Sequence, residues 1–395
     1  MGRFKRTLAA CALVTTMAAG TVGWAAGDMQ TAVTGPPPGA AAAWTADHVL
    51  GRQLPDPAAT APARAAQFFA GLTAAQRELL AARHPLVVGS LDGAPPELRY
   101  TANTRALTAE RDRELARTAD PELSGGARRQ ARERAATYGR LLTPGHRVLA
   151  FDPRGRGQVV EVYGDLRTAR RIAVVVPGSD TDLTSYTTAA RMARNLRAEM
   201  ARRAPADHPA VIAWVGYTTP VGVGYDAATG HLAEQGAPRL IRFLDGMAAT
   251  THPATPPAVF CHSYGSVLCG IAAHRLTGRQ LSDLVVAASP GMRLDRAGQV
   301  PVGARLWAAD RDPTDWVRRI PAVELFGLGH GADPTGSSFG ARVVSSDRAE
   351  GHTGYFVPGT ASLRNFADIA LGRYRAVTCA HPAPDTAKGC HHGLS

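Results

Sequence analysis

From residue 146 onward the sequence alternates short apolar runs with longer amphipathic stretches, and this alternation restricts the fold more than any other feature. The apolar runs are rich in Val and Ala and are bounded by turn residues, which is typical of strands, whereas the stretches between them have the apolar spacing of helices. Such alternation builds a mostly parallel sheet covered by helices on both faces, so we predict an α/β fold. The predicted strands are 147–151, 158–162, 171–176, 210–215, 258–261, 284–288, 304–309 and 341–345, the first two as hairpin strands, and the predicted helices lie near 186–202, 238–248, 266–276 and 361–370.

The first 145 residues have a different character. Apolar residues recur at helical spacing in 65–82, 107–119 and 127–142, which predicts an all-helical region. Before it, 35–43 contains only Pro, Gly and Ala, a composition typical of a flexible spacer. We therefore divide the chain into a signal peptide or N-terminal anchor at 1–26, a flexible spacer at 27–43, a helical N-terminal region at 44–145, an α/β domain at 146–376 and a C-terminal tail at 377–395.

The N-terminus has the residue order of a secretory signal. Three basic residues among the first six precede an apolar run at 8–19, and small residues continue to Ala26. Positive charge, an apolar segment and small residues in this order indicate export, so we predict a secreted or cell-envelope protein. The alternative is an uncleaved membrane anchor, because 8–26 is nearly long enough to span a bilayer.

The formal net charge of +11 does not indicate a nucleic-acid partner. Arginine carries nearly all of the positive charge, since lysine occurs only at positions 5 and 388. Arg191, Arg194 and Arg197 recur at helical spacing beside Ala and Met, without clustered aromatic residues. This pattern indicates a solvated helix face rather than a surface that binds nucleic acid. No specific protein partner is predicted.

Four cysteines remain once Cys11 leaves with the signal, and in an exported protein they are expected to pair. Chain order favours Cys379 with Cys390 and Cys261 with Cys269, although the sequence leaves the connectivity open. The tail histidines beside the first pair also offer metal-ligand atoms. Because the tail has no C-x-x-C spacing, we expect a disulfide there and no metal site.

The pentapeptide Cys261-His262-Ser263-Tyr264-Gly265 joins a predicted strand to a predicted helix. A serine at the tip of a sharp strand–turn–helix connection exposes its hydroxyl and has the N-terminal N–H groups of the helix behind it, as a nucleophile requires. Gly265 supplies the small residue two positions after the serine. Two positions before it, the usual glycine is replaced by Cys261, which is small enough to fit but weakens the motif. Ser263 is the predicted nucleophile.

A serine nucleophile needs a base to take its proton and a carboxylate to orient that base. Three carboxylates follow the predicted strand at 304–309 and compete for this second role. Asp312 is favoured, because it lies a few residues beyond the strand end and just before a proline, where a loop residue can turn back towards the site. Asp310 ranks second, and Asp315, which opens a predicted helix, ranks third. The others are expected to cap helices and loops.

Two histidines compete for the role of base. His352 follows the last predicted strand in a glycine-rich loop that can bring an imidazole to Ser263, and the chain order serine, acid, histidine favours it. His330 precedes that strand on a turn-rich stretch and is expected to shape a wall of the site. His262 is adjacent to the serine in sequence, so its side chain should point away and serve packing or hydrogen bonding.

The oxyanion that develops during acyl transfer needs backbone N–H donors that are already oriented. The predicted strand at 171–176 ends in a small-residue turn that contains Gly178 and Ser179. We predict that the N–H of Ser179 or Gly178 joins that of Tyr264 as the oxyanion hole.

Several stretches of the chain carry a resemblance to known proteins when taken together. They are Gly89 to Pro95 with Ala102-Asn103 and Leu107, Phe151-Asp152-Pro153, Val176-Pro177-Gly178, Trp214 to Tyr217, His262 to Gly265, Gly329-His330-Gly331, Phe339-Gly340-Ala341 and His352. With them the chain, from about Trp44 to Tyr374, resembles a family of mainly actinobacterial α/β-hydrolases long catalogued as a domain of unknown function. The resemblance implies an α/β-hydrolase fold with a helical N-terminal extension and a serine triad, carried here onto Ser263, Asp312 and His352, in a family without a settled substrate.

The sequence therefore predicts an exported serine hydrolase that cleaves a small-molecule carboxylic ester through an acyl-enzyme. Two alternatives remain open: an amidase or peptidase with the same triad, and a non-catalytic envelope-binding protein on a hydrolase scaffold. The sequence has no Gly-rich phosphate loop, dinucleotide fingerprint or metal signature, so no cofactor is expected.

Overall fold

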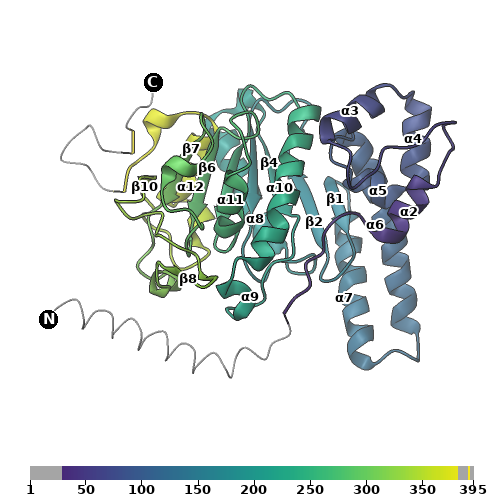
Figure 1. The fold of residues 1–395 in the computed structure, drawn as a ribbon, viewed down its shortest axis with the longest axis horizontal. Coiled ribbons are helices and arrows are strands. Elements are labelled where there is room, and N and C mark those ends of the chain that lie inside the picture. Colours follow the sequence, from purple (N-terminus) through teal and green to yellow (C-terminus); the bar gives the residue numbers. More distant parts are fainter. Residues whose placement is uncertain (1–28, 381–389, 392–395) are drawn as a thin grey trace.

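An eight-stranded sheet forms the centre of the molecule (Figure 1). The computed structural model describes residues 29–380 and 390–391, so the predicted signal at 1–26 lies outside the described residues. The strand order is β1-β2-β4-β3-β5-β6-β7-β10; β1 and β2 are antiparallel to their neighbours and all other pairs are parallel. The strands are β1 Val148–Asp152, β2 Gln158–Tyr163, β3 Ile172–Val176, β4 Ala210–Val215, β5 Ala258–His262, β6 Asp283–Ala287, β7 Arg305–Ala309 and β10 Arg342–Val344.

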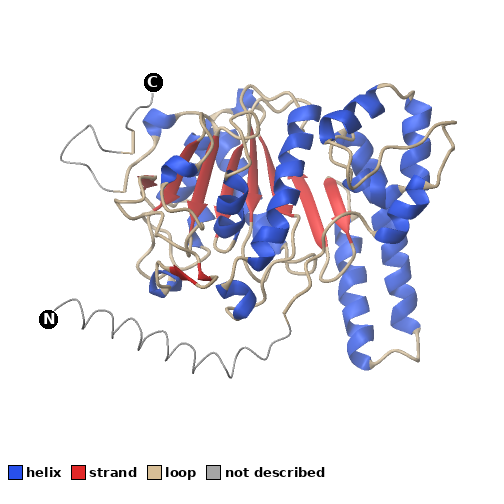
Figure 2. Cartoon of the chain, in the orientation of Figure 1, coloured by secondary structure: helices blue, strands red, loops and turns tan. Residues whose placement is uncertain are grey.

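Helices cover both faces of this sheet (Figure 2). On one face lie α8 (Thr187–Arg203) and α12 (Ala361–Ala370), and on the other lie α10 (His231–Thr250) and α11 (Gly265–Ala273). Successive residues of a central strand alternate between the two cores: Val175 packs under α8, and Val174 packs under α10. This three-layer arrangement confirms the predicted α/β fold and brings the carboxyl ends of the parallel strands to one edge.

The N-terminal helices pack beside strand β1, at one end of the sheet (Figure 1). They enclose a small core of their own around Trp44, whose indole Nε1 donates to the carbonyl of Pro55 at 2.6 Å. The long pair α6 and α7 also contributes apolar side chains to the main core. The helices are α2 Pro38–Thr45, α3 Pro62–Ala70, α4 Ala74–Arg83, α5 Pro85–Ser90, α6 Pro96–Ala119 and α7 Gly125–Leu141.

The prediction of a flexible spacer at 27–43 needs correction over the part that the structure describes. Helix α2 begins at Pro38, because the four alanines at 40–43 favour a helix and Trp44 anchors it in the core. The extended segment before α2 is also held: the N–H of Val33 donates to Thr218 Oγ1 at 2.9 Å, and Arg154 donates to the carbonyl of Gly35 at 2.6 Å.

Smaller elements surround the carboxyl edge of the sheet. They are the short helix α9 (Tyr225–Ala228), the hairpin of β8 (Glu324–Leu325) and β9 (Leu328–Gly329), and the 3₁₀-helices η3 (Trp316–Arg319) and η4 (Gly354–Phe356). No helix among the described residues is both long and apolar enough to cross a membrane.

Candidate active site

Ser263 occupies the sharp turn between β5 and α11, as the sequence predicts. Its φ of +55° lies in the left-handed region, which marks a strained turn that presents the side chain at the strand end. The turn packs closely on the end of β3. A Cβ on Gly265 would lie 2.6 Å from the carbonyl oxygen of Val176 and 2.7 Å from that of Pro177, so only glycine fits there. The elbow is therefore fixed against the neighbouring strand.

Cys261 and Cys269 form a disulfide that ties the end of strand β5 to the middle of α11. Cys379 and Cys390 form a second disulfide. Both pairings agree with the favoured connectivity. The cluster of Cys379, Cys390 and His391 has the residue types of a metal site, but the disulfide removes both thiolates that would bind the ion.

His352 lies between Ser263 and a carboxylate. Its Nε2 is 2.8 Å from Ser263 Oγ, and its Nδ1 is 2.8 Å from Asp315 Oδ1. The serine is thus in reach of a base, and the base is oriented by an acid, which is the geometry of a serine triad. The acid in this chain of contacts is Asp315, and the predicted acid, Asp312, does not take this place.

Asp315 is buried and its carboxylate is fully engaged. Oδ1 accepts from the N–H of Val317 at 3.0 Å as well as from His352, and Oδ2 accepts from the hydroxyl of Tyr355 at 2.9 Å. Burial by itself would raise the pKa of Asp315, but the hydrogen bonds from His352, Val317 and Tyr355 outweigh it and hold this pKa below its usual value. The carboxylate therefore stays ionised and can stabilise a charged imidazole.

Asp312 organises the loop instead of orienting the base. Its Oδ1 accepts from the N–H of Thr314 at 2.9 Å and from the N–H of Gly351 at 3.1 Å. Its own N–H donates to Tyr355 Oη at 3.0 Å. Asp312 thus links the loop that carries Asp315 to Gly351, the residue that precedes His352. Asp310 does not orient the base either: its Oδ1 accepts from the N–H of Arg311 at 2.9 Å.

Two aromatic side chains hold the imidazole of His352. Trp316 lies 4.6 Å away between ring centroids, and His262 lies 4.9 Å away. His262 Nε2 also donates to the carbonyl of His352 at 2.7 Å. Burial, followed by the nearby imidazole of His352, lowers the pKa of His262 to about 4, so this ring is neutral at pH 7. The expected hydrogen-bonding role of His262 agrees with these contacts.

His330 does not reach Ser263 in the structure. Its Nε2 donates to the carbonyl of Ala227 at 2.8 Å, and its ring packs edge-on against Tyr264 with centroids 5.6 Å apart. Burial lowers the pKa of His330 to about 4, which leaves a neutral ring within the wall of the site. Of the two candidate bases, only His352 contacts the serine.

The predicted oxyanion residues lie against the elbow. A Cβ on Gly178 would come within 2.6 Å of Ser263 Cβ and 2.8 Å of the backbone nitrogen of Tyr264, so the end of β3 and the start of α11 meet beside the nucleophile. Within residues 29–380, no hydrogen bond is donated by the N–H of Tyr264 or Ser179. Both donors are therefore available to a bound group.

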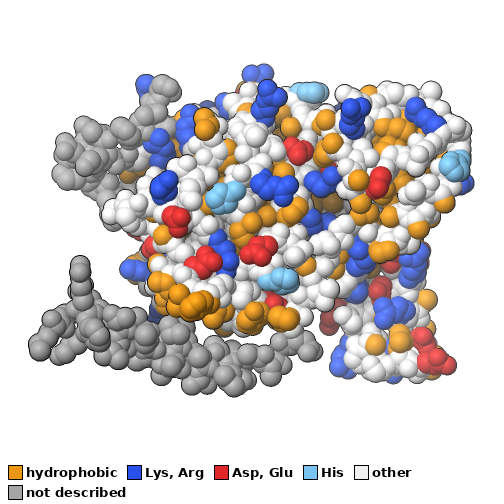
Figure 3. Space-filling model, viewed as in Figure 1, with side chains coloured by type: hydrophobic (Ala, Val, Ile, Leu, Met, Phe, Trp, Pro, Cys, Tyr) orange, Lys and Arg blue, Asp and Glu red, His pale blue; other side chains and the backbone are white. Residues whose placement is uncertain are grey.

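Exposed apolar side chains surround the carboxyl edge of the sheet, and we refer to them as the apolar rim. One part is the loop before α9, and the other is the β8–β9 hairpin, joined to the first by a bridge between Thr229 and Leu328. Figure 3 shows hydrophobic side chains gathered over β8 and α9. Phe326, at the tip of the hairpin, is 95% exposed. The rim consists of Val221, Val223, Tyr225, Val323, Leu325, Phe326 and Leu328.

Residues 152–325 match the model of a family described as alpha/beta hydrolase. This segment is similar to the alpha/beta hydrolases of that family. It contains Ser263 and Asp315 and ends before His352. The predicted fold and the resemblance stated from the sequence are confirmed.

Similar proteins have been found in mycobacteria. An uncharacterized protein of Mycobacterium tuberculosis is 28% identical over 81% of this chain, and an uncharacterized protein of Mycobacterium bovis is 36% identical over 39% of it. The matched regions cover 57% and 59% of those two proteins, so the chain spans less than two thirds of either relative.

Two solved structures have distant similarity in fold. The 2,6-dihydroxy-pseudo-oxynicotine hydrolase aligns over 88% of this chain and 100% of its own, with 11% identity and a TM-score of 0.37. An arylesterase aligns over 66% of this chain and 94% of its own, with 11% identity and a TM-score of 0.32. Scores this low do not relate the substrates of these proteins to those of this chain.

Proposed function

We propose that this chain is an exported serine hydrolase that cleaves small-molecule carboxylic esters, with Ser263 as nucleophile, His352 as base and Asp315 as the acid that orients His352. The continuous chain of hydrogen bonds from Ser263 Oγ through both imidazole nitrogens to Asp315 carries this proposal. The alpha/beta-hydrolase fold supports it, because this fold presents such a serine at a strand–helix turn.

The reaction follows from the positions of these groups. His352 Nε2 takes the proton of Ser263 as Oγ attacks the acyl carbon, and the tetrahedral oxyanion accepts hydrogen bonds from Tyr264 N–H and from the N–H of Ser179 or Gly178. His352 then gives its proton to the departing alcohol, which leaves an acyl-enzyme. Water, deprotonated by His352, attacks the acyl carbon, and His352 returns this proton to the departing Ser263 Oγ, which releases the carboxylic acid and free Ser263. Asp315 remains ionised throughout and stabilises the imidazolium.

Labelling with a fluorophosphonate probe tests the nucleophile. The wild-type chain should be labelled, and Ser263→Ala should not be; equal labelling of both would refute the assignment. A panel of matched p-nitrophenyl esters and p-nitroanilides then separates ester hydrolysis from the amidase alternative. Absence of both labelling and turnover would favour a non-catalytic protein that binds components of the cell envelope.

The apolar rim predicts a preference for esters with apolar acyl chains. Phe326→Ser should lower kcat/KM for p-nitrophenyl octanoate by about fivefold, because an acyl chain that packs on the ring buries apolar surface worth about 1 kcal/mol. The same variant should leave hydrolysis of p-nitrophenyl acetate unchanged. Val302→Ser is the matched control, since Val302 is 99% exposed but lies outside the rim. Equal losses on both esters would contradict this prediction.

The neutral state of His262 predicts a pH-dependent stability. The pKa of His262 is about 4 in the folded chain, below the ordinary value of 6.5. The unfolding free energy that the neutral ring contributes is therefore fully present above pH 6.5 and is lost as the pH falls towards 4. His262→Gln keeps an N–H donor but cannot ionise. Between pH 7 and 4.5 the wild-type chain should therefore lose about 2 kcal/mol more unfolding free energy than the variant. Denaturant titrations at the two pH values measure this difference, and identical losses would show that His262 does not titrate in this way.

A further inference from the structure

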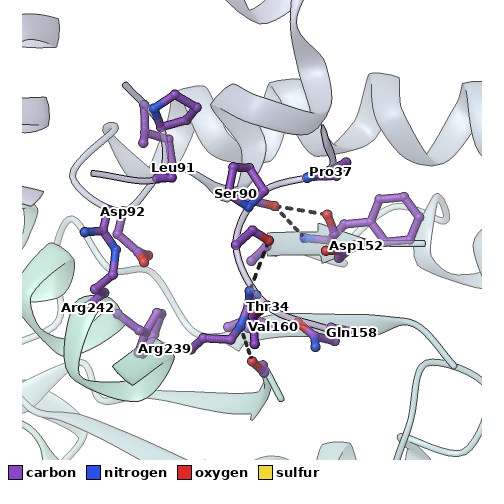
Figure 4. A pocket seen from close by; sticks show the side chains of 18 of the residues that line it. Thr34, Pro37, Ser90, Leu91, Asp92, Asp152, Gln158, Val160, Arg239 and Arg242 are labelled. Carbon is purple, nitrogen blue, oxygen red and sulfur yellow. Dashed lines mark hydrogen bonds between the residues drawn. The ribbon is translucent and has the colours of Figure 1, made fainter. Parts of the chain in front are cut away.

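A cavity of about 320 Å³ lies between the N-terminal helices and the sheet, on the side that α10 covers (Figure 4). None of Ser263, His352 and Asp315 lines it. Its volume is at the lower end of the range for small-molecule sites. The segment before α2 closes one side, since Thr34 and Pro37 belong to the lining. The cavity is thus formed jointly by both parts of the chain and is separate from the triad.

Apolar side chains form much of the cavity wall. Val160 of β2 and Trp214 of β4 point to the same face of the sheet and form its floor. Phe243 of α10 and Leu91 add further apolar surface. This wall suits the body of an apolar or partly apolar molecule.

The charged groups in the cavity do not balance. The two carboxylates already have arginine partners: Asp92 pairs with Arg99 at 3.3 Å, and Asp152 pairs with Arg154 at 2.6 Å. Figure 4 places Asp92 and Asp152 on opposite sides of the cavity. The cavity also contains two guanidinium groups from α10, those of Arg239 and Arg242.

Arg239 and Arg242 lie one helical turn apart on α10, and both line the cavity. Their side chains donate to backbone carbonyls, Arg239 to Gly216 at 2.6 Å and Arg242 to Thr60 at 2.9 Å. No carboxylate among the described residues forms an ion pair with either of them. Burial lowers the pKa of Arg239, although the nearby carboxylates of Asp152 and Asp92 act in the opposite direction without pairing directly with it. Within the described part of the chain, both guanidinium groups therefore lack a directly paired anion.

Gln158 adds an independent sign of a missing ligand. Gln158 is 4% exposed and lines the cavity, and its Oε1 has no hydrogen-bond partner among the residues that the structure describes. Its Nε2 donates to the carbonyl of Val33 at 3.3 Å, so Oε1 is the end of the side-chain amide that is left without a partner. A buried acceptor without a partner costs stability, and a hydroxyl donor on a bound molecule would satisfy it.

We propose that this cavity binds a small amphipathic anion, with a carboxylate or phosphate head at Arg239 and Arg242, a hydroxyl donor at Gln158 Oε1 and an apolar body against Val160 and Trp214. Guanidinium groups suit both kinds of head because they bind either in a bidentate manner. The site is distinct from the catalytic centre and does not depend on the esterase activity.

Titration calorimetry on the full chain with Ser263→Ala tests the site with four probes: octanoate, octyl phosphate, octanol and inorganic phosphate. One or both of the two amphipathic anions should bind, and the tighter of them identifies the head group. Octanol and inorganic phosphate should each bind at least tenfold more weakly. Failure of both amphipathic anions to bind, or equal binding of octanol or inorganic phosphate, would overturn the proposal.

Variants locate the binding. Arg242→Gln should weaken the bound anion at least tenfold, and Arg242→Lys should restore part of the affinity because it keeps the charge. Arg364→Gln is the matched control: Arg364 is exposed on α12, also donates to one backbone carbonyl, that of Gly359 at 2.9 Å, and lies outside the cavity. Unchanged affinity in Arg242→Gln, or an equal loss in Arg364→Gln, would overturn the proposal. Circular dichroism of each variant confirms that it is folded.

Discussion

Asp315→Asn should lower kcat/KM for an activated ester by about 10⁴-fold, the loss found when the acid of a serine triad becomes an amide. The amide can still accept one hydrogen bond, but it cannot stabilise the imidazolium that forms when His352 takes the serine proton. An asparagine that turns its NH₂ group towards Nδ1 also favours the wrong tautomer. Because Asp315 receives hydrogen bonds from Val317 and Tyr355, the side chain should remain in place and the fold intact.

Asp312→Asn is the matched comparison for this experiment. Its Oδ1 accepts from the N–H groups of Thr314 and Gly351, and an asparagine Oδ1 can accept both. The expected loss in kcat/KM is therefore less than tenfold. Steady-state kinetics on one p-nitrophenyl ester compare the two variants, and thermal unfolding checks that both are folded. A larger loss for Asp312→Asn than for Asp315→Asn would return the acid role to Asp312.

The identity of the acid could not be predicted from the sequence, because one aspartate can both cap a helix and orient a histidine, and sequence position does not separate these roles. Asp315 does cap η3, through its contact with the N–H of Val317. A carboxylate has two oxygens with about four acceptor positions, so one cap leaves room for His352 and Tyr355. The role of Tyr355 could not be predicted either, since nothing in its sequence position indicates that its hydroxyl links Asp315 to the backbone of Asp312.

Ser263 and His352 were predictable because local sequence and chain order determine where they lie. The run 257–260 before Ser263 is apolar, the residue two positions later is glycine, and the histidine follows the last strand. The sheet then brings the ends of β5 and β10 to the same edge. The contact between Ser263 and His352 follows from topology, whereas the choice among three neighbouring aspartates depends on the conformation of one loop.

The predicted start of the helix near 238–248 was wrong, because contacts with the sheet decide where this helix begins. The sequence predicts a helix near 238–248. In the structure α10 begins at His231 and Pro238 lies inside it. Buried side chains on both sides of the proline, including Ala233, Leu240 and Leu244, hold the helix against the sheet. Tertiary packing therefore outweighs the local cost of about 3 kcal/mol for an interior proline.

Gly265→Ala should disable the active site and destabilise the fold, because the elbow has no room for a methyl group. The added Cβ would lie 2.6 Å from the carbonyl oxygen of Val176, so either β3 or the start of α11 must move. Overpacking of this kind costs about 1–3 kcal/mol of unfolding free energy. A displacement of the nucleophile by about 1 Å lowers turnover by about 100-fold or more.

Gly139→Ala provides the control, since Gly139 lies inside helix α7 and a Cβ there would meet nothing within 4 Å. Alanine is the better helix former, so this variant should gain about 0.5–1 kcal/mol and keep full activity. Denaturant unfolding and ester turnover measured on both variants separate the effects of steric conflict from those of glycine replacement in general. Full activity in Gly265→Ala would mean that the close contact between β3 and the elbow does not position Ser263.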